Sequence, residues 1–255
     1  MNASPAAAPF TVRLRFYGGL TYFLRRPHEA GRLSRTLVEK TSIKDVIESC
    51  GVPHPEVDLI LIDDASVPFE CCVESEACVD IYGVPAPAEL HPEVRLQRGG
   101  ISSFFADGHL GKLARDLRLL GFDVLYERTA TDRALVEIAT AQQRALLTRD
   151  RRLLMHAAVR DGYCPRSLDP VEQTIEVLCR FGLRQSARPY TRCLECNGLV
   201  DVVAKADVIE QLQPLTRLHY ERFRRCRRCG KLYWRGSHFT KLEQRIDCFL
   251  KIESP

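Results

Sequence analysis

The sequence predicts an α/β domain with a parallel sheet, preceded by a small α+β domain and followed by a cysteine-rich segment. Three observations support this prediction. Residues 101–160 alternate short apolar runs with helical periodicity, residues 10–98 hold one helical stretch among strand-like runs, and two CxxC pairs follow residue 190. A chain of 255 residues has room for two or three domains of this size.

Residues 10–98 show the pattern of an α+β domain. The stretch TSIKDVIESCGV at 41–52 predicts a helix, because Ser42 is a favoured N-cap and Gly51 is a favoured stop. Apolar and alternating runs predict strands at FTVRLRFYG (10–18), VDLILIDD (57–64) and CVDIYGV (78–84). This order of elements resembles ubiquitin-like β-grasp domains, including the sulfur-carrier type, and the resemblance implies a domain that binds a protein partner.

The stretch RLQRGG at 95–100 is similar to a ubiquitin tail. Ubiquitin-like proteins conjugate through a free terminal Gly-Gly carboxylate, whereas Gly99 and Gly100 continue directly into ISSFF. We therefore interpret the glycine pair as a hinge, since such pairs are typical of loops. The internal position of the pair argues against a sulfur-carrier or conjugation role.

From residue 101 the chain alternates strands and helices, which predicts a parallel sheet covered by helices. Strands are predicted at ISSFFAD (101–107), FDVLYE (122–127) and ALLTRD (145–150), and helices at HLGKLARDLRLLGF (109–122), TDRALVEIATAQQR (131–144) and RRLLMHAAVR (151–160). In the first helix Gly121 supplies the stop. Its core-facing stripe comprises Leu110, Leu113, Ala114, Leu117 and Leu120. Asp116 is expected on the solvated face of this helix.

Three aspartates, Asp107, Asp132 and Asp150, each lie near a strand end or a helix start. The carboxyl ends of parallel strands meet at one sheet edge, so the three can converge there. Crowded carboxylates favour a hard cation such as Mg2+ or Mn2+, which can activate water for phosphodiester hydrolysis. The alternative for Asp132 and Asp150 is helix N-capping, but Asp107 suits capping less well because it directly follows FFA.

The motifs ADGHLGKLARDLRLLGFDVLY, TDRALVEIA and LLTRDRRLL resemble the PIN-like ribonuclease family named for the C-terminal domain of the Mut-seven exonuclease. The resemblance covers about residues 101–245, and bacterial members of the family also carry a ubiquitin-like domain in front. It implies a PIN-type fold with a metal-dependent ribonuclease site. Asp107, Asp132 and Asp150 match the family's acids, and Thr148 matches a polar residue that holds Asp150 or a metal-bound water.

One further acid of many PIN nucleases, usually a Glu on an intervening helix, has no counterpart at its usual place. Asp132 follows Asp107 by only 25 positions, so that section is shortened. Asp123 and Glu127 are the available substitutes, and we consider Asp123 the first candidate.

Four of the eleven cysteines have metal-ligand spacing. Cys193, Cys196, Cys226 and Cys229 form two CxxC pairs, and 29 residues separate Cys196 from Cys226. Two such pairs supply four thiolates for a structural Zn2+. The spacing exceeds the usual ~15–20 residues, so an inserted strand or helix must fill it. An odd number of cysteines scattered over a long chain predicts a reducing, cytoplasmic compartment rather than a disulfide framework.

Positive charge is concentrated near these cysteines. Residues 184–245 contain 14 Lys and Arg against 6 Asp and Glu, although the whole chain carries only +4. This distribution favours a polyanionic partner, and aromatic residues among arginines suit unpaired RNA bases. The alternative for Tyr233 and Trp234 is that they form a small core beneath the cysteines. The predicted RNA contacts are Lys112, Arg115, Arg149, Arg151, Arg225, Arg227, Arg228, Trp234 and His238.

The domains predicted are a flexible tail (1–9), a ubiquitin-like β-grasp domain (10–98), a PIN-like nuclease domain (101–188) and a zinc ribbon with a C-terminal segment (189–255). The predicted function is a metal-dependent ribonuclease of RNA processing or turnover, with structural Zn2+, catalytic Mg2+ or Mn2+, and tRNA, rRNA or the ribosome as partner. A non-catalytic RNA-binding or ribosome-associated protein is the alternative, favoured by the missing acid and opposed by the three retained aspartates.

Other classes lack support in the sequence. No run approaches 18 apolar residues, and MNASPAAAPF has neither the basic region nor the apolar core of a signal peptide. The sequence contains no Walker loop and no GxGxxG motif, which disfavours nucleotide hydrolysis. It also lacks the Ser-His-Asp pattern of a catalytic triad, which disfavours acyl transfer.

Overall fold

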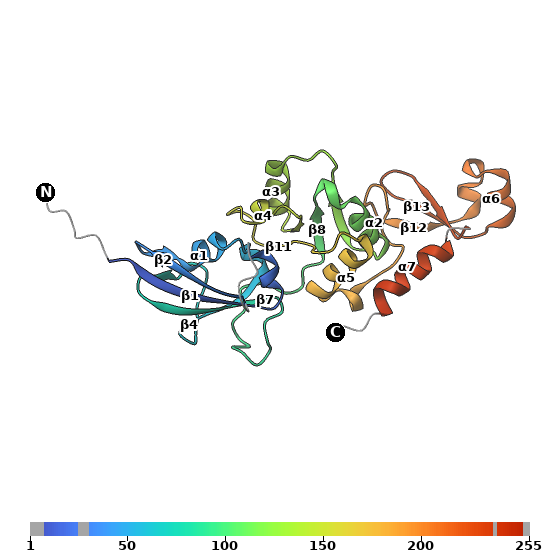
Figure 1. The fold of residues 1–255 in the computed structure, drawn as a ribbon. Helices are drawn as coiled ribbons and strands as arrows, with labels where there is room; N and C mark the ends of the chain where they lie inside the picture. Colours follow the sequence, from blue (N-terminus) through green and yellow to red (C-terminus); the bar gives the residue numbers. More distant parts are fainter. Residues whose placement is uncertain (1–7, 25–30, 237–238, 252–255) are drawn as a thin grey trace. The chain divides into compact units, whose positions relative to one another are not determined.

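The computed structural model describes residues 8–24, 31–236 and 239–251, so most of the predicted tail (1–9) lies outside the described residues. The chain forms two compact units (Figure 1). The first comprises the chain up to Gly99 together with Thr148–Cys164, and the second comprises Gly100–Leu147 and the chain from Pro165 onward. The four domain bounds given above therefore stay a prediction.

The first unit contains a five-stranded mixed sheet with strand order β2-β1-β7-β4-β5. Strand β1 pairs parallel with β7 and antiparallel with β2, while β4 pairs antiparallel with β7. Alternation along β1 buries Val12, Leu14 and Phe16, as its sequence pattern predicts. The strands are β1 (Phe10–Tyr17), β2 (Arg32–Leu37), β4 (Val57–Ile62), β5 (Ala65–Ser66) and β7 (Ala77–Gly83), with 3-10 helices η1 (Gly18–Phe23) and η3 (His54–Glu56).

Helix α1 (Ile43–Ser49) begins as predicted. The Ser42 side chain accepts a hydrogen bond from the Asp45 N–H at 3.1 Å, and the helix buries Ile43, Val46 and Ile47 against the sheet core. Short strands β3 (Thr41–Ser42) and β6 (Cys72–Val73) pair beside it. The arrangement confirms the ubiquitin-like β-grasp prediction.

Residues 148–164 belong to this same unit and carry α4 (Arg151–Leu154) and β11 (Gly162–Tyr163). The predicted helix at 151–160 is too long, because the chain leaves helical geometry after Leu154. The segment instead makes contacts with the β-grasp domain. The Val159 carbonyl accepts from His54 Nε2 at 2.6 Å, and the Cys164 N–H donates to the buried Glu56 carboxylate at 2.7 Å.

The second unit is built on parallel strands in the order β10-β8-β9. The strands are β8 (Ser103–Ala106), β9 (Asp123–Tyr126) and β10 (Ala145–Leu147). Helix α2 (Gly111–Leu119) packs on β8, β9 and α5 (Pro170–Arg180), whereas α3 (Asp132–Ala141) packs on β8 and β10. The predicted leucine stripe of α2 is confirmed, since all five of its residues are at most 2% exposed.

Gly121 ends α2 as predicted. Its φ is +93°, and a Cβ placed there would lie 2.1 Å from the Arg188 carbonyl oxygen. The Arg188 and Tyr190 N–H groups donate to the last carbonyls of α2, those of Leu120 and Leu119. This close approach requires glycine and joins the C-terminal segment to the parallel-sheet domain.

Asp116 is buried, so its predicted place on a solvated face is wrong. Helix α7 (Phe239–Lys251) covers it, and Arg245 pairs with both Asp116 oxygens at 2.7 and 2.5 Å. Burial raises the pKa of Asp116 above its usual value, while the hydrogen bonds and the charge of Arg245 oppose that shift.

We expect Arg245→Met to lower the free energy of unfolding of the second unit by about 2 kcal/mol at neutral pH. Breaking a fully buried ion pair typically costs ~3–5 kcal/mol, and the cost here is smaller because Arg245 is partly exposed. The carboxyl group of Asp116 has a pKa that is raised in the folded state. Its protonated form therefore favours folding at low pH, and this contribution is lost as pH rises. The deficit should therefore shrink as pH falls through the folded-state pKa of Asp116. Chemical denaturation at several pH values measures it, and a pH-independent deficit would contradict the assignment.

The C-terminal segment of the second unit holds an antiparallel sheet, β12-β13-β14. Its strands are β12 (Val200–Val203), β13 (Phe223–Cys226) and β14 (Leu232–Trp234). The long spacing between the CxxC pairs is filled, as expected, by β12, η6 (Lys205–Asp207), η7 (Ile209–Gln211) and α6 (Pro214–His219). The second unit also contains the 3-10 helices η4 (Gly108–Leu110) and η5 (Arg184–Ser186). Among the described residues, no helix is long and apolar enough to cross a membrane.

Candidate zinc site and candidate nuclease residues

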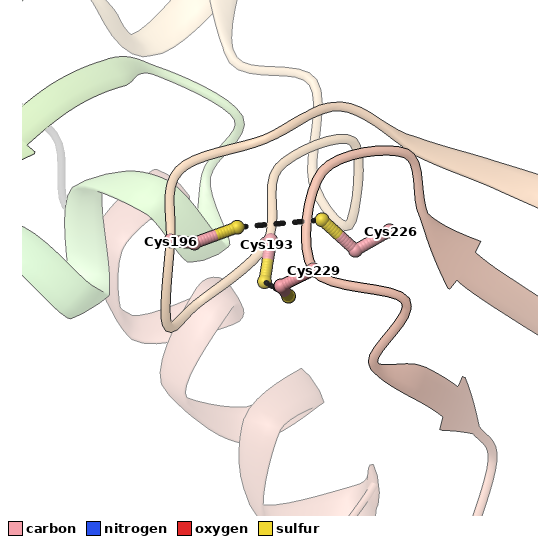
Figure 2. Close-up of side chains that lie close together, drawn as sticks. All are labelled: Cys193, Cys196, Cys226 and Cys229. Atoms are coloured by element: carbon pink, nitrogen blue, oxygen red, sulfur yellow. Dashed lines mark hydrogen bonds between the residues drawn. The ribbon is translucent and has the colours of Figure 1, made fainter.

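The two CxxC pairs converge in the second unit. Figure 2 shows the loop of Cys193 and Cys196 facing the loop of Cys226 and Cys229. The Cys193 and Cys229 sulfurs lie 3.7 Å apart, and the Cys196 and Cys226 sulfurs lie 3.4 Å apart. All four sulfurs lie within 4.8 Å of one another.

This geometry fits a zinc ion. Four sulfurs at ~2.3 Å from one Zn2+ in a tetrahedron lie about 3.8 Å apart, which is close to the distances observed. The sulfur separations are too long for disulfide bonds, and all eleven cysteines are free thiols. The cluster can therefore bind zinc with a closed shell of four protein ligands, as a structural ion requires.

Tyr233 contacts the cysteine cluster directly, as the alternative of a core beneath the cysteines predicts for it. Its hydroxyl lies 3.0 Å from Cys193 Sγ and accepts from the Leu194 N–H at 3.1 Å. Burial opposes ionisation of Cys193, but hydrogen bonds from backbone N–H groups and from Tyr233 lower the pKa of this thiol to about 6. Tyr233 thus favours the thiolate that metal binding needs.

Two buried polar side chains, Arg118 and Asn197, join the first cysteine loop to the parallel sheet. Arg118 is 5% exposed and donates to the carbonyls of Val124, Leu194 and Glu195. Asn197, which adopts a left-handed backbone conformation at φ 65°, accepts from the Val124 N–H and donates to Asp123 at 2.7 Å. The cysteine cluster is therefore anchored on α2 and β9.

Asp123, the predicted fourth acid, belongs to this anchor. Its carboxylate accepts from Arg144 at 2.8 Å and from Arg192 at 3.3 Å, besides Asn197. Burial would raise its pKa, but these hydrogen bonds and charges together lower it below the usual value. Asp123 pairs with Ser103 at the amino end of the parallel strands, opposite the end that Asp107 follows. The contacts indicate a structural role and do not support the catalytic one.

Asp107 lies at the carboxyl end of β8, at the N-cap position of η4, with no side-chain capping hydrogen bond. Glu127 follows the last residue of β9, which pairs with Ala106. The two loops touch, since a Cβ on Gly108 would lie 2.6 Å from the Arg128 carbonyl oxygen and Tyr126 donates to the Gly108 carbonyl. Glu127 is therefore the better placed of the two substitute acids.

Asp132 opens α3, but the capping alternative for it is wrong. The Thr131 side chain caps the helix by accepting from the Ala134 N–H at 3.3 Å. Asp132 occupies the exposed first turn. Its position at the loop that follows β9 agrees with the sheet edge predicted for it.

Asp150 and Thr148 lie in the first unit, in the segment that follows β10. Asp150 caps α4, and Oδ1 accepts both capping hydrogen bonds, from the N–H groups of Arg152 and Leu153. The capping alternative is therefore confirmed for Asp150. The buried Thr148 hydroxyl accepts from the Asp150 N–H at 3.0 Å and so fixes the backbone of that acid.

The carboxylates do not form a compact ligand group by themselves. In the part of the chain that the structure describes, the four cysteines are the only group of three or more potential ligands within 4.8 Å of one another. Mg2+ retains several waters between itself and its protein ligands, so carboxylates that bind it need not lie in contact with one another. The carboxylate oxygens have the chemistry that Mg2+ or Mn2+ needs, and their convergence stays a prediction.

The predicted RNA contacts fall into two groups. Several form contacts within the protein. Arg115 pairs with Glu195, and Arg227 pairs with Asp201. Arg228 donates to the Cys196 carbonyl, and Arg151 donates to the carbonyls of Phe23 and Tyr22. Lys112 and Arg225 are exposed, Arg149 is half-buried and Trp234 is 41% exposed. His238 lies outside the described residues.

A family model described as Mut7-C RNAse domain matches residues 102–246, more than half of the chain. The chain belongs to the Mut7-C RNAse domain family. A second model, described as Mut7-C ubiquitin, matches residues 10–89. No curated protein matches the chain. The two matches confirm the predicted family and the order of a ubiquitin-like domain followed by a Mut7-C domain, and membership of this family indicates a ribonuclease-related function.

Proposed function

We propose that this protein is a metal-dependent ribonuclease that hydrolyses RNA phosphodiesters in RNA processing or turnover. The observation that carries the proposal is Asp107 in a Mut7-C RNAse domain, at the carboxyl end of the central parallel strand. Catalytic sites of open parallel sheets lie at this edge. Glu127 beside it and Asp132 at the start of α3 supply further carboxylates, and Asp150 follows the parallel strand β10.

Asp107, Asp132 and Asp150 would hold Mg2+ or Mn2+, which supplies water activation and charge stabilisation when bound. Thr148 would fix Asp150 through the backbone contact described above. Lys112 on the exposed surface of α2 would attract phosphate toward Asp107. The basic ribbon, held together by Zn2+, would bind the RNA strand, and the ubiquitin-like domain would bind a protein partner.

The deciding experiment incubates metal-depleted, zinc-replete protein with structured and unstructured RNAs and then adds Mg2+ or Mn2+. We expect Asp107→Asn and Asp132→Asn to lower cleavage by about 100-fold or more, the scale of losing one preorganised charge contact. RNA binding should be retained. Glu137→Gln, which removes an exposed acid of α3 paired with Arg133, is the matched control and should cleave normally.

The same experiment tests the alternative of a non-catalytic RNA-binding or ribosome-associated protein, which the structural role of Asp123 favours. Binding without metal-dependent cleavage would establish that alternative. Equal residual cleavage in the wild type and both aspartate variants would indicate a contaminating nuclease and would refute the enzyme proposal. Glu127→Gln then decides whether Glu127 replaces the missing acid.

A further inference from the structure

A cavity of about 470 Å³ lies in the second unit, beside the antiparallel sheet β12-β13-β14. Ribbon strands, the loop that ends at Arg192, and the start of α7 form its walls. Its volume lies within the range of small-molecule sites, about 300–1,000 Å³. Among its lining residues are Trp234, one of the predicted RNA contacts, and Tyr233, which contacts Cys193.

Aromatic rings form two of its walls. Tyr190 and Phe239 are stacked, with ring centroids 5.1 Å apart and planes 24° apart. On the other side, Trp234 packs on the buried Phe223 with centroids 6.4 Å apart, yet remains 41% exposed. An exposed tryptophan beside a cavity offers a planar face on which a flat ring can stack.

The charged side chains of the cavity favour an anion. Arg192, Arg222, Arg224, Arg235 and Lys205 line it, against a single acid, Glu221, which pairs with Lys205. Arg192 and Arg224 are held by contacts inside the protein, the latter with the Tyr190 carbonyl at 2.9 Å. Arg235 lies over the Phe239 ring at 4.7 Å, and Arg222 is exposed. These two guanidinium groups are accessible to a phosphate at the rim.

The backbone of Tyr190 is strained at this wall, with φ at 63°. A bulky residue adopts this left-handed conformation at a cost of about 1–3 kcal/mol and only where the surroundings impose it. Here its N–H donates to the Leu119 carbonyl and its carbonyl accepts from Arg224, so both sides of the residue are fixed. Strain of this kind concentrates at ligand sites, and it holds the Tyr190 ring against Phe239.

We propose that this cavity binds one unpaired nucleotide of single-stranded RNA, with the base on Trp234 and its phosphate on Arg222 and Arg235. The choice of RNA rests on the proposed function, whereas the preference for an unpaired base follows from the cavity. A base that enters it must leave its partner, so duplex RNA cannot use the site. The site would therefore make the protein selective for single-stranded segments.

Trp234 is the only tryptophan in the chain, so its fluorescence reports directly on the site. We expect an unstructured 12-nucleotide RNA to quench this fluorescence without any divalent cation, and a perfect duplex to quench it far less. By anisotropy, Trp234→Ala should weaken binding of the single strand about 10-fold, the equivalent of ~1.4 kcal/mol of stacking. Trp234→Phe should retain most of the affinity. Leu218→Ala, at an exposed apolar residue of α6 outside the cavity, is the control and should bind normally.

The salt dependence of binding tests the phosphate contact separately. Arg222→Gln should reduce the slope of log affinity against log salt by about 0.7, the loss of one phosphate contact on a single strand. Unchanged single-strand affinity in Trp234→Ala, or equal quenching by the duplex, would overturn the proposed site. Quenching without metal-dependent cleavage would leave this site standing and refute only the nuclease proposal. Metal-dependent cleavage by the wild type, together with unchanged RNA affinity in Trp234→Ala, would support the nuclease proposal and refute only the nucleotide site.

Discussion

Cys226→Ser is expected to reduce the zinc content from about one ion per chain to near zero and to unfold the ribbon. Zinc binding contributes roughly 10–16 kcal/mol to the folding of small zinc domains, and three thiolates do not complete the tetrahedral shell. The apolar core available as a substitute is small: its buried residues are Val208, Leu212 and Phe223. Elemental analysis measures the zinc, and hydrogen exchange of residues 191–234 measures the folding.

The damage should extend beyond the ribbon. Arg118 would lose its acceptors at Leu194 and Glu195 and keep only Val124, while the half-buried Asp123 would lose Asn197 and Arg192 and keep Arg144. Charged groups of the parallel-sheet domain would therefore lose part of their compensation. We therefore expect a lower melting temperature for the whole second unit. Cys248→Ser, at an exposed cysteine of α7 outside the cluster, controls for loss of a thiol. Full zinc occupancy in Cys226→Ser would show that Cys226 is not a ligand.

Local signals in the sequence predicted the elements well. The Ser42 cap, the leucine stripe of α2 and the Gly121 stop depend on neighbours within one or two turns, and all three are confirmed. The CxxC pairs predicted the four-cysteine cluster equally well, because each pair places two metal ligands at a fixed spacing in one loop.

Long-range partners decided the cases that the sequence could not predict. Asp116 is buried because Arg245, 129 residues later, neutralises it. Asp123 resembled a catalytic acid in sequence, but Arg144, Arg192 and Asn197 occupy its carboxylate. The helix predicted at 151–160 ends early without any local stop signal, and the chain that follows it binds His54 instead. Helical periodicity carries no information about such contacts.

Arg151→Ala is expected to loosen residues 151–163. If the proposed nuclease function of Asp150 holds, this variant should also lower kcat for RNA cleavage with little change in KM. The Arg151 guanidinium donates to the Phe23 carbonyl at 2.9 Å and to the Tyr22 carbonyl at 3.3 Å, and it lies over both rings. Hydrogen bonds to a charged group contribute about 1.5–3 kcal/mol. Amide exchange within the segment should therefore accelerate about 10- to 100-fold.

Arg152→Ala is the matched control, because Arg152 neighbours it on α4, carries the same charge and is exposed. The comparison separates two roles for Arg151. A phosphate-binding role, as predicted from the sequence, would weaken RNA binding and leave exchange of the segment unchanged. A structural role would accelerate exchange and preserve RNA binding. The second result would mean that the ubiquitin-like domain holds the segment that carries Asp150, together with the contacts of His54 and Glu56 to Val159 and Cys164. The domain would then be part of the nuclease itself, and a protein partner bound to it could alter catalysis through this segment.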